Sequence, residues 1–186
     1  TRIISGRAGG AVLQVPGSGT RPTSDRVRES LFAALESAGE LEDARVLDLY
    51  AGSGALGLES LSRGATVVDL VEKAPSAAQV ATRNATRIAG ATDGTAQVHR
   101  AAALTWLARS PGTRYTLVFL DPPYDVTDDE LAETLRALDP HLDVDALVVV
   151  ERGKRSPEPQ WTDTRLKLER TKTYGDTTMW WARVSA

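Results

Sequence analysis

Segments that are almost wholly apolar alternate with amphipathic segments from residue 45 onward, and this alternation constrains the fold more than any other feature. Residues 67–71, 117–120 and 146–150 contain few polar side chains. A strand that is apolar on both faces must be covered on both sides, which is typical of a parallel sheet between two layers of helices. The sequence therefore predicts an α/β fold built on a doubly wound, mostly parallel sheet.

The expected elements follow one another in a regular order. Strands are predicted at residues 46–50, 67–71, 96–99, 117–120 and 146–150. Helices are predicted at residues 55–62, 75–89, 103–108 and 127–138, the last of which has Thr127 and Glu130 in the positions of a capping box. Residues 165–173 and 177–184 predict an antiparallel hairpin at the end of the sheet.

The first 40 residues follow a different pattern. Two short strands, at residues 3–4 and 11–15, flank a glycine-rich turn and predict a small β-hairpin. A helix is expected to begin after Thr23 or Ser24 and to end before Gly39. We therefore expect an N-terminal extension over residues 1–40 and a main domain over residues 41–186.

Composition excludes several kinds of chemistry. The 186 residues contain no cysteine, so disulfides, thiolate metal sites and a cysteine nucleophile are excluded. Only His99 and His141 could supply imidazole, and we expect no metal site and structural roles for both. No apolar run approaches the ~18 residues that a membrane span needs, and no signal-peptide pattern opens the sequence. We expect a cytoplasmic protein without membrane contact.

The net charge of −3 hides an uneven distribution. Up to Ser30 there are five basic residues against two acidic ones, and from Arg152 to Lys172 there are seven against three. Two basic ends around an acidic middle suggest an anionic partner held near the termini. The alternative is that both ends are ordinary solvated edges of the protein.

A glycine motif follows the first predicted strand of the sheet. Gly52 and Gly54 allow the backbone to turn sharply and to approach a ligand closely. With Glu72 some 20 residues further on, the segment also fits a dinucleotide site, and a purely structural turn is a further alternative. However, Asp48 precedes the glycines and would repel a pyrophosphate, whereas it would accept an aminoacyl ammonium. This form resembles the cofactor loop of Rossmann-like methyltransferases, which implies S-adenosylmethionine, with Glu72 accepting its ribose hydroxyls.

A second motif, Asp-Pro-Pro-Tyr at residues 121–124, directly follows an apolar strand. Parallel sheets bind ligands at this end of a strand. A carboxylate and a backbone carbonyl beside an exocyclic amino group can accept its N–H groups, localise its lone pair and stabilise the positive charge that develops in the transition state. The prolines would keep the loop rigid, and Tyr124 could stack on the base. The alternative is a Pro-Pro turn without a catalytic role.

Several segments together resemble one family. Asp-Pro-Pro-Tyr is similar to the motif of amino-group nucleic-acid methyltransferases. The chain is further similar to the bacterial small-subunit (16S) ribosomal RNA guanine-N2 methyltransferase D family at residues 2–7, 21–29, 50–57, 149–151 and 174–176. The resemblance implies S-adenosylmethionine-dependent methylation of one guanine N2 in 16S ribosomal RNA, within a partly assembled small subunit. A monomer is expected.

The resemblance also implies roles for single residues. The catalytic residues would be Asp121, Pro122, Pro123 and Tyr124. The cofactor would be bound by Asp48, Tyr50, Gly52, Ser53, Gly54, Glu72, Lys73, Ala102, Ala103 and Asp121. One position departs from the family, because Ala102 stands where an Asp or Asn usually faces the adenine amino group. Either the alignment is shifted there, or a backbone group of Ala102 or Ala103 takes that role.

The basic ends supply candidate RNA contacts, since arginine binds phosphate in a forked geometry. These are Arg2, Arg7, Arg21, Arg26, Arg28, Lys154 and Arg155. Arg28 could equally form a structural pair with Glu29. Two other functions stay open: an adenine-N6 nucleic-acid methyltransferase, although nothing here is large enough for a DNA target-recognition domain, and an RNA-binding assembly factor without catalysis.

Overall fold

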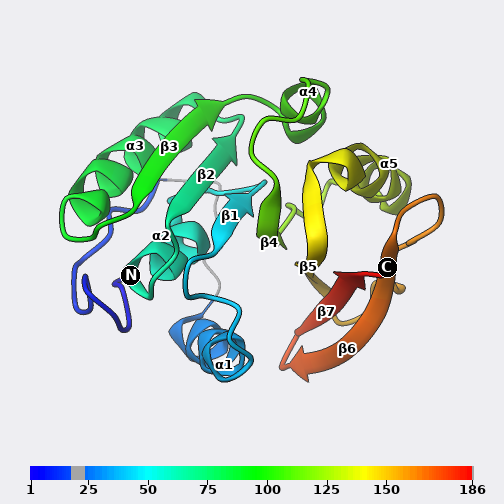
Figure 1. Cartoon of the computed structure of the whole chain (residues 1–186), viewed down its shortest axis with the longest axis horizontal. Coiled ribbons are helices and arrows are strands. Elements are labelled where there is room, and N and C mark those ends of the chain that lie inside the picture. Colours follow the sequence, from blue (N-terminus) through cyan, green and yellow to red (C-terminus); the bar gives the residue numbers. More distant parts are fainter. Residues whose placement is uncertain (18–23, 186) are drawn as a thin grey trace.

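The computed structural model describes residues 1–17 and 24–185, which form an α/β structure around one sheet (Figure 1). Within these residues the strands are β1 (Arg45–Asp48), β2 (Val67–Glu72), β3 (Thr95–Arg100), β4 (Tyr115–Leu120), β5 (Leu142–Gly153), β6 (Leu166–Tyr174) and β7 (Thr177–Val184). The helices are α1 (Asp25–Ser37), α2 (Ala55–Ser62), α3 (Pro75–Ala89), α4 (Ala103–Leu107) and α5 (Asp128–Leu138), with a short 3-10 helix at Asp139–His141.

The strand order is β3-β2-β1-β4-β5-β7-β6. Strands β1 to β5 pair in parallel, whereas β7 is antiparallel to both β5 and β6. The chain runs outward from β1 through β2 to β3 and then returns to the other side of β1 at β4. The strand order therefore reverses between β1 and β4, where doubly wound sheets hold their ligands. The predicted fold class, with its C-terminal antiparallel hairpin, is confirmed.

Two layers of helices cover the sheet. On one face, α1, α2 and α3 bury apolar side chains against the sheet, as in the cluster that contains Phe32, Leu58 and Ala81. On the other face, α4 and α5 bury Trp106 and Leu135 against the remaining strand side chains. The central strands are thus apolar on both sides because both sides are covered, as the sequence pattern required. Figure 1 shows the two helical layers on either side of the strands.

Local signals set the ends of several helices. Helix α3 begins at Pro75 and is followed by Gly90, and α5 begins after Thr127, whose side chain accepts a hydrogen bond from the backbone N–H of Glu130. Helix α1 begins after Ser24, whose hydroxyl accepts from Val27 N–H at 3.2 Å. These are the caps that the sequence predicted. No helix of the described residues is long and apolar enough to cross a membrane.

The N-terminal hairpin is reduced to a single antiparallel bridge between Arg2 and Val12. The two segments do pair, because Ile3 N–H donates to the carbonyl of Ala11 at 2.9 Å and Leu13 N–H donates to that of Thr1 at 2.8 Å, but they form no longer strands. The buried carboxylate of Glu59, on α2, accepts the backbone N–H groups of Ile4 and Ser5 at 2.8 and 3.1 Å, which holds the segment against the main domain. Ile3 is fully buried in the same cluster as the sheet. The division at residue 40 therefore stays a prediction.

Candidate active site

A cavity of about 1500 Å³ lies at the carboxyl ends of the parallel strands. Its walls come from the loop after β1, the end of β2, the start of α4, the loop after β4, the first turns of α1 and the β6–β7 turn. These segments are far apart in the sequence, and the reversal of strand order between β1 and β4 brings them together. The cavity is large enough to hold a nucleoside cofactor and a second planar group.

The loop after β1 has the conformation that its glycines predicted. Gly52 has φ 56° and Gly54 has φ 89°, a backbone region that side chains disfavour. Gly57 serves packing instead: a Cβ there would lie 2.4 Å from Leu70 and 2.9 Å from Val68 on β2. The third glycine of the motif thus lets α2 lie directly against the sheet.

Asp48 ends β1 at the floor of the cavity and is 1% exposed. Its Oδ2 accepts the backbone N–H of Gly57 at 3.1 Å, while its Oδ1 has no hydrogen-bond partner among the described residues. Burial raises the pKa of Asp48 from 3.8 to about 7, against the opposing effect of the Gly57 hydrogen bond and with a smaller contribution from the charge of Glu72. A buried carboxylate oxygen without a partner suits a cationic ligand.

Glu72, at the end of β2, is bound by two loops. Its Oε1 accepts the backbone N–H of Gly52 at 2.9 Å, and its Oε2 accepts that of Ala74 at 2.8 Å. Because each carboxylate oxygen can accept more than one hydrogen bond, the group remains able to accept hydroxyl groups of a ligand. Its orientation is fixed by the backbone on both sides.

Ala102, where the family usually has Asp or Asn, lies just after the end of β3. The chain leaves β3 at Arg100, and Ala102 is the residue before the first turn of α4. Ala102 and Ala103 both line the cavity. The position therefore falls at the cavity wall, and its side chain is a methyl group that cannot accept a hydrogen bond from an amino group.

The Asp-Pro-Pro-Tyr segment follows β4, the neighbour of β1, and all four of its residues line the cavity. Pro122 is buried, whereas Tyr124 is 74% exposed. The segment closes in a turn, because Val126 N–H donates to the carbonyl of Pro123 at 3.1 Å. Arg152 on β5 donates to Val126 O at 3.2 Å and to Asp128 at 3.0 Å, which ties this loop to the sheet.

Most of the predicted cofactor residues meet in this cavity. Those that line it are Asp48, Tyr50, Gly52, Ser53, Glu72, Lys73, Ala102, Ala103 and Asp121. Gly54 does not line the cavity; it is buried immediately before α2 and serves the turn. Burial raises the pKa of Tyr50, so its phenol is neutral at physiological pH.

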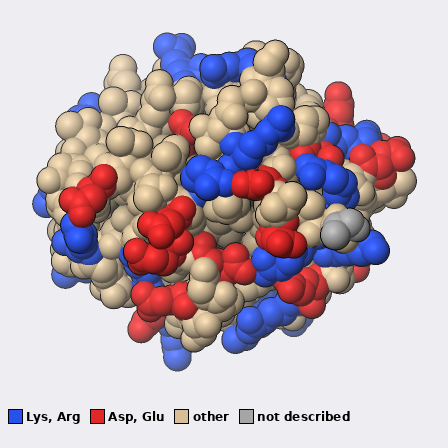
Figure 2. Space-filling model, viewed as in Figure 1, with Lys and Arg blue, Asp and Glu red and all other residues tan. Residues whose placement is uncertain are grey.

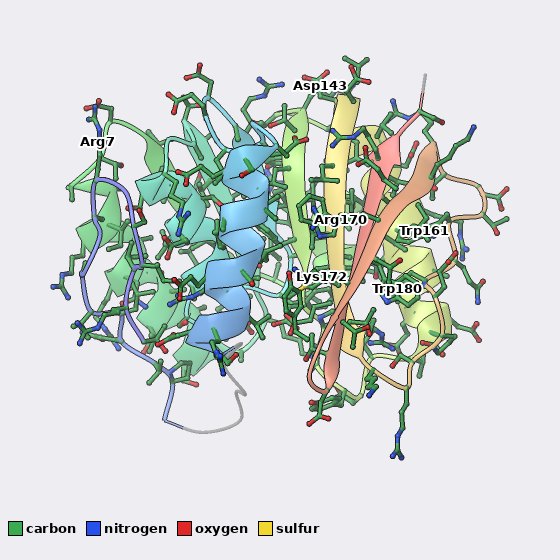
Figure 3. The ribbon with its side chains drawn as sticks, turned by 90° about the horizontal axis from the view of Figure 1, so that it is seen from below. Arg7, Asp143, Trp161, Arg170, Lys172 and Trp180 are labelled. Carbon is green, nitrogen blue, oxygen red and sulfur yellow. The ribbon has the colours of Figure 1, made fainter. Side chains whose placement is uncertain are left out.

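The predicted RNA contacts divide into different environments. Arg26 is exposed and lines the cavity, and Lys154 and Arg155 are exposed beside the cavity-lining Gly153. Arg2 is exposed at the N-terminal bridge, outside the cavity wall. Arg7 pairs with Asp93 in the loop before β3, at the opposite edge of the sheet, where Figure 3 labels it. Arg21 lies outside the described residues.

The ion pair of Arg28 differs from the one that the sequence suggested. Its side chain is 1% exposed, and its guanidinium donates to the carbonyl of Arg2 at 2.6 Å and to Asp25 at 3.1 Å. The structural alternative was a pair with Glu29, but the carboxylate that it contacts is Asp25, three residues earlier on α1. Arg28 thereby joins α1 to the N-terminal segment. It also lines the cavity, and its Nε and Nη1 have no hydrogen-bond partner among the described residues, so its role in RNA contact stays a prediction.

The remaining polar residues behave as structural groups. His141 is buried and its Nε2 lies 2.9 Å from the carbonyl of Leu107. His99 lies 2.8 Å from Asp69, which also accepts the hydroxyl of Tyr115 at 2.6 Å. Within residues 1–17 and 24–185, no group of His, Cys, Asp and Glu could hold a metal ion.

Some cavity residues were not predicted as site residues. These are the β6–β7 turn at residues 174–177, Glu130 and Thr134 on α5, and Glu151 and Arg152 at the end of β5. Tyr174-Gly-Asp and Glu151 belong to segments that carried the family resemblance, which was the available signal. Arg152 and Thr134 gave no signal, because their place in the cavity depends on packing between strand and helix.

Three features together define a Rossmann-like methyltransferase. The sheet ends in antiparallel strands, a glycine loop lies between Asp48 and Glu72, and the Asp-Pro-Pro-Tyr segment lines the same cavity. The family model described as "Conserved hypothetical protein 95" matches residues 1–183. The chain belongs to this family, which includes the ribosomal RNA small subunit methyltransferase D proteins that it matches. The family resemblance drawn from the sequence is confirmed.

Relatives and solved structures support this assignment. The chain is 43% identical over 153 residues to Ribosomal RNA small subunit methyltransferase D of Escherichia coli, covering 81% of this chain and 73% of that protein. It is 35% identical over 158 residues to the protein of the same name from Haemophilus influenzae, covering 84% and 80%. The solved structure of Escherichia coli yhhF superimposes with a TM-score of 0.85 at 36% identity, covering 100% of this chain and 98% of that one.

Proposed function

We propose that this protein transfers the methyl group of S-adenosylmethionine to the exocyclic N2 of a specific guanine in 16S ribosomal RNA. One observation carries the proposal: the glycine loop with Glu72 and the Asp-Pro-Pro-Tyr segment face a single cavity. A cofactor pocket alone would fit many enzymes of this fold. The amino-acceptor segment beside it, together with the names of the relatives, narrows the reaction to methylation of a nucleobase amino group in ribosomal RNA.

The residues of the cavity fit S-adenosylmethionine. When bound, this cofactor supplies an electrophilic methyl group on a sulfonium centre. The unpartnered Oδ1 of Asp48 would accept the aminoacyl ammonium, and the Glu72 carboxylate would accept the ribose hydroxyls. The alanines after β3 offer no side-chain acceptor, so a backbone group of Ala102 or Ala103 would receive the adenine amino group. The Asp48 carboxyl beneath the loop offers no positive charge or N–H donor to a pyrophosphate and repels it when ionised, which disfavours NAD or FAD.

Asp121 would act on the target amino group. The lone pair of guanine N2 is delocalised into the ring, which makes the nitrogen a weak nucleophile. Hydrogen bonds from the N2 hydrogens to the Asp121 carboxylate and to a backbone carbonyl of the rigid Pro122–Pro123 turn would localise that lone pair. The positive charge that develops on nitrogen would then be stabilised by a fixed carboxylate. Arg152 holds the far end of the loop and helps to keep this geometry.

The target base must leave its stack to enter the cavity. Tyr124, at the mouth and 74% exposed, would hold the flipped guanine by stacking. Arg26 lines the same cavity, and Lys154 and Arg155 are exposed next to its lining residue Gly153. These three residues would contact the adjoining phosphates, with Arg2 at the N-terminal segment. Figure 2 shows that basic and acidic side chains are interspersed on the face it draws, so recognition would depend on local contacts more than on a broad positive field.

The reaction can be tested directly. We expect ribosomal RNA from cells lacking this protein to lose one N2-methylguanosine, measured by nucleoside mass spectrometry, and to regain it when the parent protein is supplied. An unchanged N2-methylguanosine content would overturn the proposal. Appearance of N6-methyladenosine instead would favour the adenine alternative, and rescue by a protein without methyl transfer would favour a non-catalytic assembly factor.

The proposal also covers the assembly state of the RNA substrate and the oligomeric state of the enzyme. We infer that the protein acts as a monomer in the cytoplasm on a partly assembled small subunit, and that residues 1–40 serve mainly in RNA contact. Methyl transfer should then be faster on partly assembled subunits than on naked 16S RNA. Sedimentation analysis should give the 19.9 kDa mass of one chain. Equal rates on both substrates would contradict the subunit preference, and a 40 kDa species (about twice the chain mass) would contradict the monomer.

A further inference from the structure

The β6–β7 hairpin carries a cationic surface that the site described above does not include. In antiparallel pairs, opposite residues share one face of the sheet. Arg170 pairs with Trp181, and Lys172 pairs with Met179. Both Trp181 and Met179 belong to the core on the α1 side of the sheet. The two cations therefore lie on that side, and Figure 3 shows them between α1 and the hairpin.

Each cation is placed over an aromatic ring. The Arg170 guanidinium lies 4.9 Å from the Trp181 ring centroid, and the Lys172 ammonium lies 4.9 Å from that of Tyr174. Such stacking holds the alkyl stems against apolar surface and leaves the N–H groups directed outward. We call these four residues, Arg170, Lys172, Trp181 and Tyr174, the hairpin cation surface.

Two carboxylates near this face are paired with another basic residue. Arg183, which is opposite Lys167 on β6, pairs with Glu40 at 2.6 Å and with Glu169 at 3.0 Å. Within the described residues, neither Arg170 nor Lys172 forms an ion pair at 4.0 Å or less. Two positive charges thus remain available to an anionic partner on this face.

The surface leads to the cavity. Tyr174 lines the cavity and also carries Lys172, so the cations continue along β6 from its wall. The cavity itself contains acidic residues, among them Glu29, Asp121 and Asp176. A phosphate would be repelled from the acidic interior, whereas an uncharged base could enter it. The acidic cavity and the cations on β6 therefore suit an RNA strand with one base in the cavity and its phosphates along β6.

We propose that the hairpin cation surface binds the sugar–phosphate backbone of the RNA strand that adjoins the target nucleotide. This inference rests on the proposed function and extends it to a second contact, on the hairpin side of the cavity. Cations on an edge strand also prevent pairing with other chains. Protection of the edge requires only polar side chains, whereas phosphate binding requires positive charge. Substitution of both cations by glutamine keeps the edge polar and removes the charge, so it distinguishes edge protection from RNA binding.

The test compares two double variants that each lose two positive charges. In Arg170→Gln/Lys172→Gln the surface loses its cations. In the control, Arg109→Gln/Arg136→Gln, one arginine lies over Trp106 at 5.5 Å, which matches Arg170, and the other is exposed on α5. The probe is labelled 16S RNA, measured by filter binding from 50 to 200 mM salt. S-adenosylhomocysteine titration and thermal unfolding check the cofactor site and the fold.

We expect the hairpin variant to bind RNA about tenfold more weakly than the control, with a salt-dependence slope smaller by about 1 to 2. The KM for RNA should rise while kcat at saturating RNA stays within about twofold of the parent, because a contact made equally in ground and transition states is lost. Affinity for S-adenosylhomocysteine should be unchanged. The charge-preserving Arg170→Lys/Lys172→Arg variant should bind RNA within about twofold of the parent.

Equal RNA affinity and slope in the hairpin and control variants would overturn the inference, and so would equal losses in both, since these would indicate only a general effect of net charge. Weakening by the charge-preserving variant would also overturn it and assign the residues to packing of the hairpin. The proposed function is tested separately by the parent protein: absence of guanine-N2 methylation in the parent refutes that function whatever the variants do.

Discussion

The backbone N–H of Gly52 donates a 2.9 Å hydrogen bond to Oε1 of Glu72, so the loop after β1 and the end of β2 are joined directly. The other oxygen of Glu72 accepts Ala74 N–H at 2.8 Å. One carboxylate thus orders the glycine loop and the entry to α3 at once. The residue assigned to the cofactor ribose is also the residue that shapes the loop around it.

Replacing Glu72 should therefore weaken cofactor binding in two ways. Glu72→Ala removes the acceptor for the ribose hydroxyls and releases Gly52, and we expect S-adenosylhomocysteine binding to weaken by about 1.5–3 kcal/mol. Glu72→Gln keeps one carbonyl acceptor and should lose less. Calorimetric titration measures both, with the exposed Glu133→Ala on α5 as the control. A dissociation constant for Glu72→Ala equal to that of the control would remove Glu72 from the site.

Asp48 should make the stability of the ligand-free protein depend on pH. Its folded-state pKa of about 7 lies above the ordinary 3.8, so the folded protein binds more protons than the unfolded chain between these values. The stabilising contribution of protonated Asp48 is fully present below about pH 4 and is lost as the pH rises through 7. Asp48→Asn stays neutral, so its melting temperature should exceed that of the parent at pH 8 by roughly 10 °C, since a pKa raised from 3.8 to about 7 corresponds to ~4 kcal/mol.

The same substitution should weaken cofactor binding, because the aminoacyl ammonium loses its anionic partner. The two melting temperatures should converge toward pH 4, where Asp48 is protonated in the folded parent and begins to be protonated in its unfolded chain. Differential scanning calorimetry across pH 4 to 8 measures this, with the exposed Asp125→Asn as the control. If Asp48→Asn gives the same pH profile as the parent, a different group controls the titration.

Glu59 should be the main tie between the N-terminal segment and the sheet. It is fully buried and accepts N–H groups from Ile4, Ser5 and Arg63. Glu59→Ala removes the buried partner of the Arg63 charge and the acceptor of two backbone N–H groups, which should lower the free energy of unfolding by about 3–5 kcal/mol. Glu36 also pairs with Arg63, at 3.5 Å, but its side chain is 61% exposed. Glu36→Ala should cost under about 1 kcal/mol in the same urea titration, and equal losses would refute the assignment.

This contact also marks the limit of prediction from the sequence. Helices α2 and α3 could be predicted with their observed bounds, because Pro75 and the flanking glycines signal their ends locally. The contact that holds the N-terminal segment against α2 could not be predicted, since Glu59 lies 55 residues from Ile4 in sequence. The burial of the Arg28 side chain could not be predicted for the same reason, because its hydrogen-bond partner Arg2 is 26 residues away in the sequence. Motif residues of the site were predictable, whereas cavity residues placed by tertiary packing were not.

Tyr124 should hold the target base. Tyr124 is 74% exposed at the cavity. An aromatic ring there can stack on a base, a contact worth about 1–3 kcal/mol. Tyr124→Ala should raise the KM for RNA accordingly, while Tyr124→Phe keeps the ring and should stay within about twofold of the parent. Steady-state kinetics on the small subunit would separate the two. Similar losses in both variants would assign the contribution to the hydroxyl and exclude stacking as its source.

Asp121 should separate catalysis from binding. Asp121→Ala removes the acceptor that polarises the target amino group but leaves the glycine loop and Glu72 in place. Cofactor affinity should change little, whereas the single-turnover rate of methyl transfer should fall roughly 100-fold or more, the scale of losing one fixed electrostatic group. Asp125→Ala is the matched control, because Asp125 lines the same cavity four residues further along the chain and has no assigned role.

Asp121→Asn tests which property of the carboxylate matters. The amide oxygen can still accept one N–H group of guanine N2, but it carries no negative charge to balance the positive charge on the nitrogen. We therefore expect a rate between those of the parent and Asp121→Ala. A rate for Asp121→Asn equal to that of Asp121→Ala would mean that charge, and not hydrogen bonding, drives the reaction. A rate for Asp121→Ala equal to that of the parent would show that the Asp-Pro-Pro-Tyr segment does not act on the amino group, and the catalytic groups would then have to lie elsewhere on the cavity wall.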